Sequence, residues 1–290
     1  MGRSPLLFLV YAAIPPAERD ESTLYPQQAR AQQDRPEGSP DKLAAVTAWL
    51  RLTLLGTGAM NSPRYPPAGL LVRYRRQRVM IDGGPGAEPT GPLAAWLVSD
   101  ERGELRAELR MLAAIHGVQP VAAATTIADL VIEPHPVVHT SHPAWGYLLR
   151  LPVASAVWAP EFWLFPAWAA GADLMFADAA GWNRPIRFAH GAGGHMAALD
   201  VAEQARQHQV KRLVFAHIGR PSLRAIDAGY RLPFGEWGEL GRTYRIPVPD
   251  RPVIIGQVVA STQQKVLPDR SQAIARTSRH PMGRGVLASG

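Results

Sequence analysis

The sequence predicts a mixed α/β (or α+β) fold, in which β-sheets pack on one another and helices cover the outside. Two patterns lead to this expectation. Short apolar segments bounded by glycine and proline, which are typical of strands, dominate the first half of the region that begins at residue 51. In the second half, strand-like segments alternate with a segment of helical period. A chain with both patterns favours packed sheets whose outer faces are buried by helices.

The first expected elements lie before residue 116. The segment RLTLLGTG (51–58) predicts a strand that runs into a glycine turn. Residues 69–84 predict a hairpin, with GLLVRY and RVMID as its strands and 75–77 as its turn. Residues 101–115 predict a helix, because apolar side chains recur on one helical face. These apolar residues are Leu105, Leu109, Leu112 and Ile115.

The later expected elements end at residue 218. Apolar runs predict four more strands, at 129–140, 145–152, 155–160 and 172–178. Residues 197–209 predict a helix that turns Val201 and Ala205 toward the core. The continuous apolar segment KRLVFAHI (211–218) then predicts a buried strand that contains His217.

We expect one folded domain at 51–246 between two loosely attached ends. Residues 1–50 are a leader that is polar from about 15 to 45, and residues 247–290 lack a sustained period, so both are expected to be disordered. The chain has a net charge of +7, and the tail carries six basic residues against two acidic ones. Such a tail can contact nucleic acid or acidic lipid, although a solvated end explains the same composition.

Composition limits the kinds of site and compartment. No segment approaches the roughly 20 apolar residues of a membrane-spanning helix. The apolar run at 6–14 is short for an export signal and no clear cleavage site follows it, so we expect a cytoplasmic protein, with export as the alternative. The chain has no cysteine, so a bound metal would need nitrogen and oxygen ligands.

Seven of the nine histidines lie between residues 135 and 217. His217 lies near the end of an apolar strand, where it is either a metal ligand or a hydrogen-bonded core histidine. His195 follows a glycine pair whose backbone freedom lets a loop approach a ligand closely, and a helix-entry position is the ordinary alternative. His139 and His142 share one extended segment, which favours one of them, rather than both, as a ligand.

Three acidic residues each stand at the exit of an apolar strand: Asp82, Glu161 and Asp178. A carboxylate in such a place is costly unless it is paired, hydrogen-bonded or bound to a cation. Asp82 has a simpler explanation, because an aspartate can cap a turn through backbone amides. Strand ends meet at a shared rim, so these acids and the histidines are candidates for one site.

In their order along the chain, these segments resemble the metallo-β-lactamase-fold hydrolases, especially the ribonuclease Z and phosphodiesterase-like branch. The resemblance covers about residues 52–218 and rests on the following stretches: LTLLGTG with the hairpin to MIDGG, His139 before Gly146–Tyr147, Glu161 after a strand, GADLMFADA, GGHMAALDVAEQA and KRLVFAHI. It implies a four-layer αββα sandwich with a hydrolytic site along one edge.

The resemblance also implies roles for five residues. His139 and His217 match metal ligands, and Glu161 stands where the family has an aspartate that bridges two metals. Asp178 matches the glutamate of a His-Glu-Ala-Thr stretch that here lacks its histidine. His195 matches a histidine that assists at the scissile phosphate. We therefore expect the first three to bind metal and the other two to act in catalysis.

The chain departs from the family at one motif. A His-x-His-x-Asp-His loop, which supplies four ligands and the base in the family, is absent between Asp82 and His139. We expect this interval to be shortened, without room for the family's strand, loop and helix. The remaining two histidines and one carboxylate predict a single divalent ion, Zn²⁺ or else Mn²⁺ or Fe²⁺. His142 and Asp82 are further candidates as ligands.

Two functions from different classes remain open. The first is a hydrolase that acts on a small-molecule phosphoester or related ester through a metal-activated water, with Asp178 or His195 moving the proton. The alternative is a degenerate, metal-free family member that serves as a binding or scaffold protein. Aromatic residues of WAPEFWLFPAW (158–168) would line its pocket, or else they simply fill the core. A nucleic-acid partner, bound by the basic tail and the arginines of the 69–84 hairpin, is a third idea.

Overall fold

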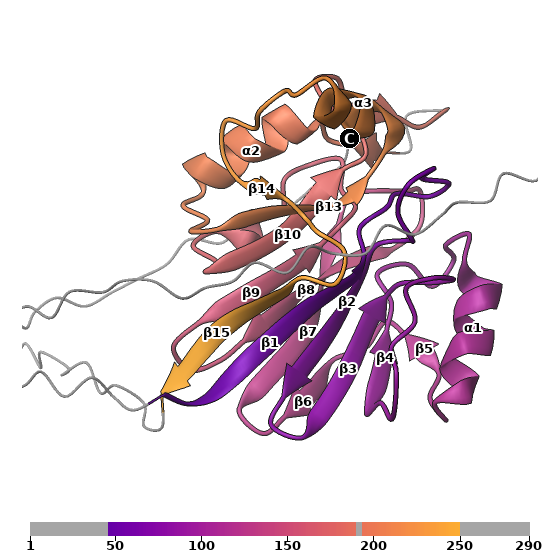
Figure 1. Cartoon of the computed structure of the whole chain (residues 1–290), viewed down its shortest axis with the longest axis vertical. Coiled ribbons are helices and arrows are strands. Elements are labelled where there is room, and N and C mark those ends of the chain that lie inside the picture. Colours follow the sequence, from indigo (N-terminus) through magenta and orange to yellow (C-terminus); the bar gives the residue numbers. More distant parts are fainter. Residues whose placement is uncertain (1–45, 190–192, 250–290) are drawn as a thin grey trace, which may run out of the picture. The chain divides into compact units, whose positions relative to one another are not determined.

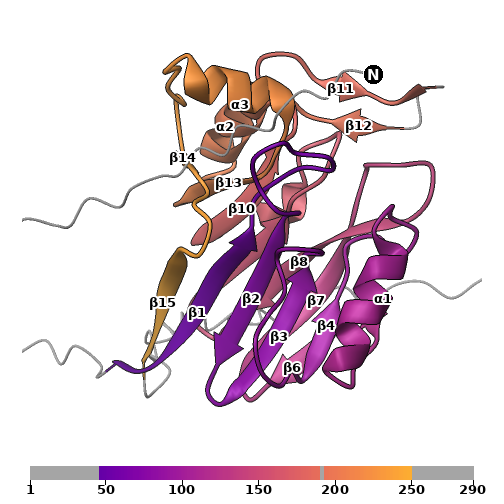
Figure 2. The same cartoon turned by 45° about the vertical axis from the view of Figure 1, so that its right-hand side comes forward.

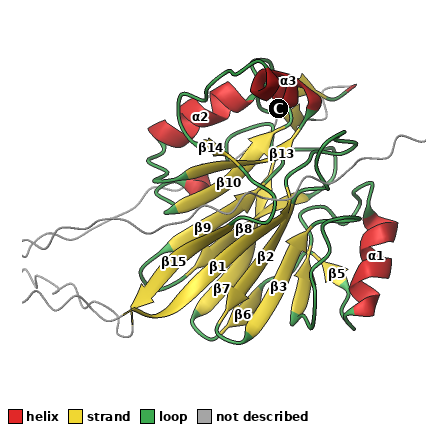
Figure 3. Cartoon of the chain, in the orientation of Figure 1, coloured by secondary structure: helices red, strands yellow, loops and turns green. Residues whose placement is uncertain are grey.

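The computed structural model describes residues 46–189 and 193–249. Most of the expected leader (1–50) and tail (247–290) lies outside these residues. Strands predominate in the described chain, and three α-helices accompany them (Figure 3). Among the described residues, no helix has the length and apolar character needed to cross a membrane.

The first sheet has six strands in the spatial order β15-β1-β2-β3-β4-β5 (Figure 1). Its strands are β1 (Val46–Gly56), β2 (Gly69–Tyr74), β3 (Gln77–Asp82), β4 (Ala95–Leu97), β5 (Pro120–Val121) and β15 (Thr243–Pro249). The hairpin expected at 69–84 is present as β2 and β3, which turn at Arg75 and Arg76.

The second sheet has seven strands in the order β14-β13-β10-β9-β8-β7-β6. Its strands are β6 (Thr125–Ile127), β7 (Leu130–Val137), β8 (Ala144–Arg150), β9 (Ser155–Ala159), β10 (Leu174–Ala179), β13 (Leu213–Ile218) and β14 (Glu236–Trp237). The central strands β9, β10 and β13 run parallel, and a short ribbon of β11 (Ile186–Arg187) and β12 (Gly194–His195) follows β10 in the chain.

Three helices complete the layers: α1 (Arg106–Ile115), α2 (Ala198–Gln207) and α3 (Arg220–Asp227), together with a 3₁₀ turn at Ala167–Ala169. Figure 2 shows α1 on the side of the first sheet, and α2 and α3 on the side of the second. The order helix, sheet, sheet, helix is the four-layer αββα sandwich that the sequence predicts.

Alternation along the strands explains the layers, because successive side chains point to opposite faces of a sheet. Between the sheets, Val72 of β2 belongs to one buried cluster with Trp158 of β9 and Phe176 of β10. Its neighbour Leu71 faces outward and packs with Leu109 of α1. On the other side of the sandwich, small residues of α2 pack against β10 and β13; they are Ala198, Ala202 and Ala205.

Some details differ from the expectation. The helix predicted at 101–115 begins only at Arg106, and Ile115, predicted on its buried face, is 79% exposed because Ala113 packs against the sheet instead. The interval between Asp82 and His139 does hold a strand, a loop and a helix, namely β4, the segment to residue 105, and α1. The prediction that it lacks room for them is wrong, because β4 needs only three residues.

Four of the five aromatic residues of the segment 158–168 belong to the core or pack against it. Trp158 and Phe162 are fully buried, and Phe165 and Trp168 pack partly buried against the cluster beneath α2. These side chains therefore fill space between layers, as the simpler of the two interpretations predicts. Because Trp158 and Phe162 are fully buried, neither side chain is available to line an open recognition pocket.

Close packing of α2 is testable at Ala202, which is fully buried. Ala202→Leu should lower the free energy of unfolding by about 1–3 kcal/mol, because extra methyl groups overpack the contact with the sheet. Ala107→Leu, at an exposed position of α1, is the matched control and should change it by less than about 0.5 kcal/mol. Urea unfolding measures both. Equal losses in the two variants would contradict this packing.

Candidate metal centre

Five polar residues meet at one edge of the second sheet. Asp178 lies in β10, His217 in β13 and His195 in β12, whereas His139 and Glu161 follow β7 and β9. Each of these residues lies at or just beyond the end of its strand. Four of the five side chains are buried, and that of Glu161 is 27% exposed.

An irregularity in β13 sets the position of His217. The register between β10 and β13 shifts because Ala177 pairs with Phe215 and Ala179 with Ile218, which leaves one extra residue on β13. His217 lies within this bulge and has φ of 57°, a left-handed conformation that non-glycine residues adopt rarely. Such strain is found where a fold directs a side chain to a particular place.

Two glycines let the loop before β12 approach His139. Gly193 and Gly194 have φ of 124° and 149°, and a Cβ on Gly193 would collide with the carbonyl of His139. The close approach is used twice. The amide of Gly194 donates to the carbonyl of His139 at 2.9 Å. The carbonyl of Gly194 accepts a hydrogen bond from Nδ1 of His139 at 3.0 Å.

Glu161 lies between two imidazoles. Its Oε2 is 3.2 Å from Nε2 of His139, and its Oε1 is 2.9 Å from Nδ1 of His217. These three residues are the trio that the sequence predicts as metal ligands. The structure brings them together, although they are 22 and 56 positions apart along the chain.

Asp178 is fully buried and each of its oxygens is occupied. Oδ1 accepts from the amide of Ala180 at 2.9 Å, and Oδ2 accepts from the amide of Phe162 at 3.2 Å and from Nδ1 of His195 at 2.8 Å. A neutral His195 that donates from Nδ1 to this carboxylate has its lone pair on Nε2.

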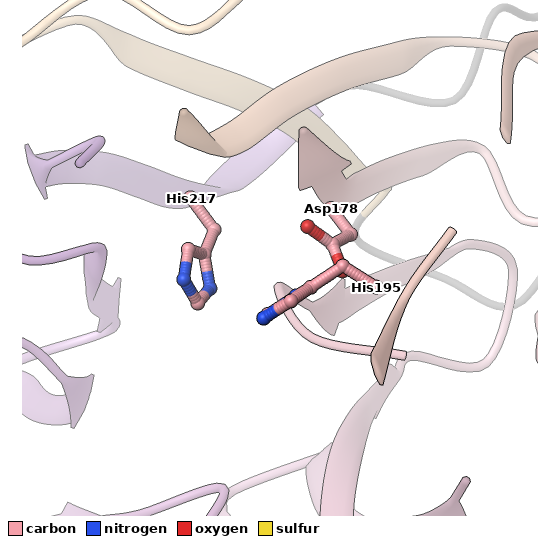
Figure 4. Close-up of side chains that lie close together, drawn as sticks. All are labelled: Asp178, His195 and His217. Atoms are coloured by element: carbon pink, nitrogen blue, oxygen red, sulfur yellow. The ribbon is translucent and has the colours of Figure 1, made fainter. Parts of the chain in front are cut away.

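The imidazole of His195 lies close to those of His139 and His217. The ring centroid of His195 lies 4.7 Å from that of His139 and 5.1 Å from that of His217. Figure 4 shows His195 and His217 directed toward each other, with Asp178 behind His195. One ligand atom from each of Asp178, His195 and His217 lies within 4.8 Å of the others, a separation that a single ion can span.

Burial and charge oppose each other at this centre. Burial acts to lower the pKa of His139, but the hydrogen bond and charge of Glu161 outweigh it and raise that pKa to about 9. Burial also acts to lower the pKa of His217, but the charge of Glu161 outweighs it and raises that pKa. Burial would raise the pKa of Glu161, but His217 and His139 hold it well below its ordinary value.

Asp82 joins the two sheets beside the centre. Its carboxylate accepts from the amide of Ser99 at 2.6 Å and from the indole of Trp158 at 2.7 Å, and burial raises its pKa to about 6. Asp82, Glu161 and His217 line an open cleft of about 100 Å³. Asp82 thus borders the cleft, but its hydrogen bonds to Ser99 and Trp158 give it a structural explanation.

His142 lies in a separate pair. Its Nε2 is 2.8 and 2.9 Å from the two carboxylate oxygens of Asp100. Asp100 belongs to the segment between β4 and α1 and lines the cleft. The structure therefore gives His142 a carboxylate partner of its own, apart from the three converging imidazoles.

Solved structures match this architecture. The metallo-β-lactamase fold protein YhfI from Bacillus subtilis has a TM-score of 0.51 at 12% identity, over 68% of this chain and 100% of that chain. Human tRNase Z, short form, has a TM-score of 0.52 at 14% identity, again over 68% and 100%. The chain has the metallo-β-lactamase fold. No protein-family model and no curated protein matches the sequence.

In this metallo-β-lactamase fold, the segment between β4 and α1 contributes carboxylates to the cleft. Asp100 and Glu104 line it together with Ser99, and the first histidine after Asp82 is His116, beyond the end of α1. The segment therefore offers no imidazole to a second ion. The candidate metal ligands His139, Glu161 and His217 lie in or just after strands of the second sheet.

Two parts of the centre are not predicted by the sequence. The sequence predicts His195 as a catalytic residue and not as a ligand, whereas the structure places it in the three-residue group with Asp178 and His217. No pattern indicates Phe188, whose ring contacts those of His139 and His195 edge-on at 5.3 and 5.4 Å. The glycine pair before His195 was the available signal of a close approach.

The metal-free protein should lose stability as the pH rises from about 6.5 to about 9. The pKa of His139 is near 9 in the folded protein, whereas the ordinary pKa of a histidine side chain is 6.5, so folding favours the protonated ring. This stabilisation is complete below pH 6.5 and disappears as the pH passes through 9. Thermal unfolding with a chelator measures it, and His139→Gln should flatten the profile. A midpoint that rises through this range would contradict the pairing with Glu161.

Proposed function

We propose that the protein is a metal-dependent hydrolase that acts on a phosphoester or related ester. The observation that carries this proposal is the convergence of His139, His195 and His217 beside the carboxylate of Glu161. Three histidines that leave an open position are a recurrent catalytic zinc set. We propose one Zn²⁺, with Mn²⁺ or Fe²⁺ as alternatives, because imidazole and carboxylate suit all three ions.

The donor set fits such an ion through its tautomers. A ligating histidine commonly donates its other ring N–H to a carbonyl or carboxylate, which fixes the ring and its free lone pair. His139 makes this contact with the Gly194 carbonyl, and His195 makes it with Asp178. In both, Nε2 is then the nitrogen that would bind metal, and Nε2 of His139 would exchange its 3.2 Å contact with Glu161 for the ion. Neither ring can be turned without breaking a buried hydrogen bond.

A bound divalent ion lowers the pKa of its water to near neutrality and so supplies a nucleophile for ester hydrolysis. The chain's own residues have separate tasks. His139, His195 and His217 would bind the ion. Glu161 would place a carboxylate oxygen beside it. Asp178 is a positioning residue, since its oxygens are already occupied by His195 and two amides. The cleft of about 100 Å³ admits the substrate from the side of Glu161 and His217.

The geometry also supports a second candidate, a metal-free binding or scaffold protein. Glu161 satisfies His139 and His217 with ion pairs that need no cation, and its pKa is held low by them. A buried histidine–glutamate–histidine chain can persist as a structural network. Metal content separates the two candidates.

The purified protein should retain about one equivalent of metal through dialysis, measured by elemental analysis. His217→Ala should lose that metal and the hydrolysis of bis(p-nitrophenyl) phosphate and p-nitrophenyl acetate, which probe phosphoesters and carboxylic esters. His116→Ala, which removes a histidine whose Nδ1 contacts the Gly91 carbonyl, is the matched control and should retain both. Metal-free wild-type protein, or undiminished turnover in the folded His217→Ala variant, would overturn the proposal.

Asp178→Asn tests the positioning role. The substitution removes the charge that orients His195, and loss of such a contact weakens metal affinity by about 10- to 100-fold. Competition with a chromophoric chelator measures the affinity. Asp227→Asn, at a residue that pairs with Arg64 on the surface, serves as the control and should bind metal as wild type does. Unchanged affinity in a folded Asp178→Asn protein would show that Asp178 does not position a ligand.

A further inference from the structure

The outer face of the first sheet carries a row of arginines. Arg51 of β1 stands opposite Arg245 of β15 on one side and Arg73 of β2 on the other, and Arg73 stands opposite Arg78 of β3. The four strands lie side by side (Figure 1). Three of the side chains are exposed and that of Arg78 is partly buried. The buried residues next to them in each strand face the other sheet, so the arginines face outward.

The row concentrates positive charge on one face of the sheet. Opposed residues of antiparallel strands lie about 5 Å apart, so four charges occupy about 15 Å. Like charges directly opposite each other destabilise a sheet. Within 46–189 and 193–249, none of the four arginines forms an ion pair with a carboxylate. An anionic partner would offset the repulsion.

Arg78 adds an independent sign of a missing acceptor. Its Nε and Nη2 atoms are shielded from solvent and have no hydrogen-bond partner among the described residues. A guanidinium donor in that position is costly to leave unsatisfied.

Trp49 lies beside the row. It shares the outward face of β1 with Arg51, two residues away, and is 41% exposed. Trp49 borders an open hollow of about 370 Å³. Five arginines also line the hollow: Arg51, Arg73, Arg75, Arg76 and Arg78. An indole ring among guanidinium groups offers a stacking surface surrounded by phosphate-binding donors.

The face is separate from the metal centre. Farther along the same outer surface, Leu71 and Met80 are covered by α1. The arginine row lies toward the opposite end of the strands, since Arg78 precedes Asp82 by four residues of β3, or about 13 Å. A ligand on this face would therefore contact neither the three imidazoles nor Asp178 directly.

We propose that this face, formed by Trp49, Arg51, Arg73, Arg78 and Arg245, binds a single-stranded nucleic acid. The arginines bind successive phosphates and Trp49 stacks on a base. A duplex hides the faces of its bases, so it would leave Trp49 without a role. An anionic membrane would require several apolar side chains to enter it, and among the described residues that line the hollow Trp49 is the one large apolar side chain.

The sequence predicts a nucleic-acid contact by the basic tail together with the arginines of the 69–84 hairpin. Arg73 and Arg78 belong to the hairpin that the sequence singles out. Arg51 and Arg245 join them only because β1 pairs with both β2 and β15. Most of the tail lies outside the described residues, and none of the five residues of this face belongs to it.

Fluorescence anisotropy of the full chain with a labelled single strand of about 12 nucleotides tests the proposal. Titrations between about 50 and 200 mM salt should give a log–log slope of about −3, because each phosphate contact to a single strand contributes about −0.7. RNA and DNA strands are measured in parallel. R51Q/R73Q/R245Q should flatten the slope by about 2 and weaken binding at low salt at least about tenfold. Trp49→Ala should weaken binding by about 5- to 150-fold.

The matched control is R184Q/R224Q/R231Q, which removes three exposed arginines from other parts of the chain and should leave the slope unchanged. Metal content should stay at the wild-type value in both triple variants. Three results would overturn the proposal: no binding by the wild-type protein, equal losses in the two triple variants, or binding to phosphatidylserine vesicles through Arg51, Arg73 and Arg245 without binding to either strand.

Discussion

A fully buried carboxylate, Asp178, holds the candidate centre together. Burying it without partners would cost several kcal/mol, so the fold supplies two amides and the Nδ1–H of His195. These contacts join β10, β12 and the segment after β9, on which Glu161 stands. His195 is thereby fixed in the tautomer that leaves Nε2 toward His139 and His217. The convergence of the three imidazoles follows from this one satisfied charge and from the bulge that turns His217 inward.

Much of the fold was readable in the sequence, because buried strands are apolar runs and the hairpin at 69–84 has a clear turn. The short elements β4 and β5 escaped notice since two or three residues carry no period. Asp178, His195 and His217 could be placed at a shared edge, but not paired. The left-handed φ of His217 and the approach of Gly194 to His139 depend on contacts between segments more than 35 residues apart, which no local pattern records.

The two unusual features of the molecule lie on different parts of the sandwich. The histidine-rich centre lies at the strand ends, where irregular backbone can aim side chains inward. The arginine row lies on the regular part of the first sheet, where register alone puts like charges opposite each other. Chemistry at one end and capture of a polyanion on the face would suit a substrate longer than the cleft. Each part has its own residues, so each can be removed without the other.

The central claim is that His139, His195 and His217 share one cation. Crystals grown with Zn²⁺ and measured on both sides of the zinc absorption edge test it most directly. We expect one anomalous peak, at about 2.0–2.1 Å from a nitrogen of each of the three imidazoles. A peak bound by other residues, or a zinc-loaded crystal with no peak among the three rings, would contradict the account.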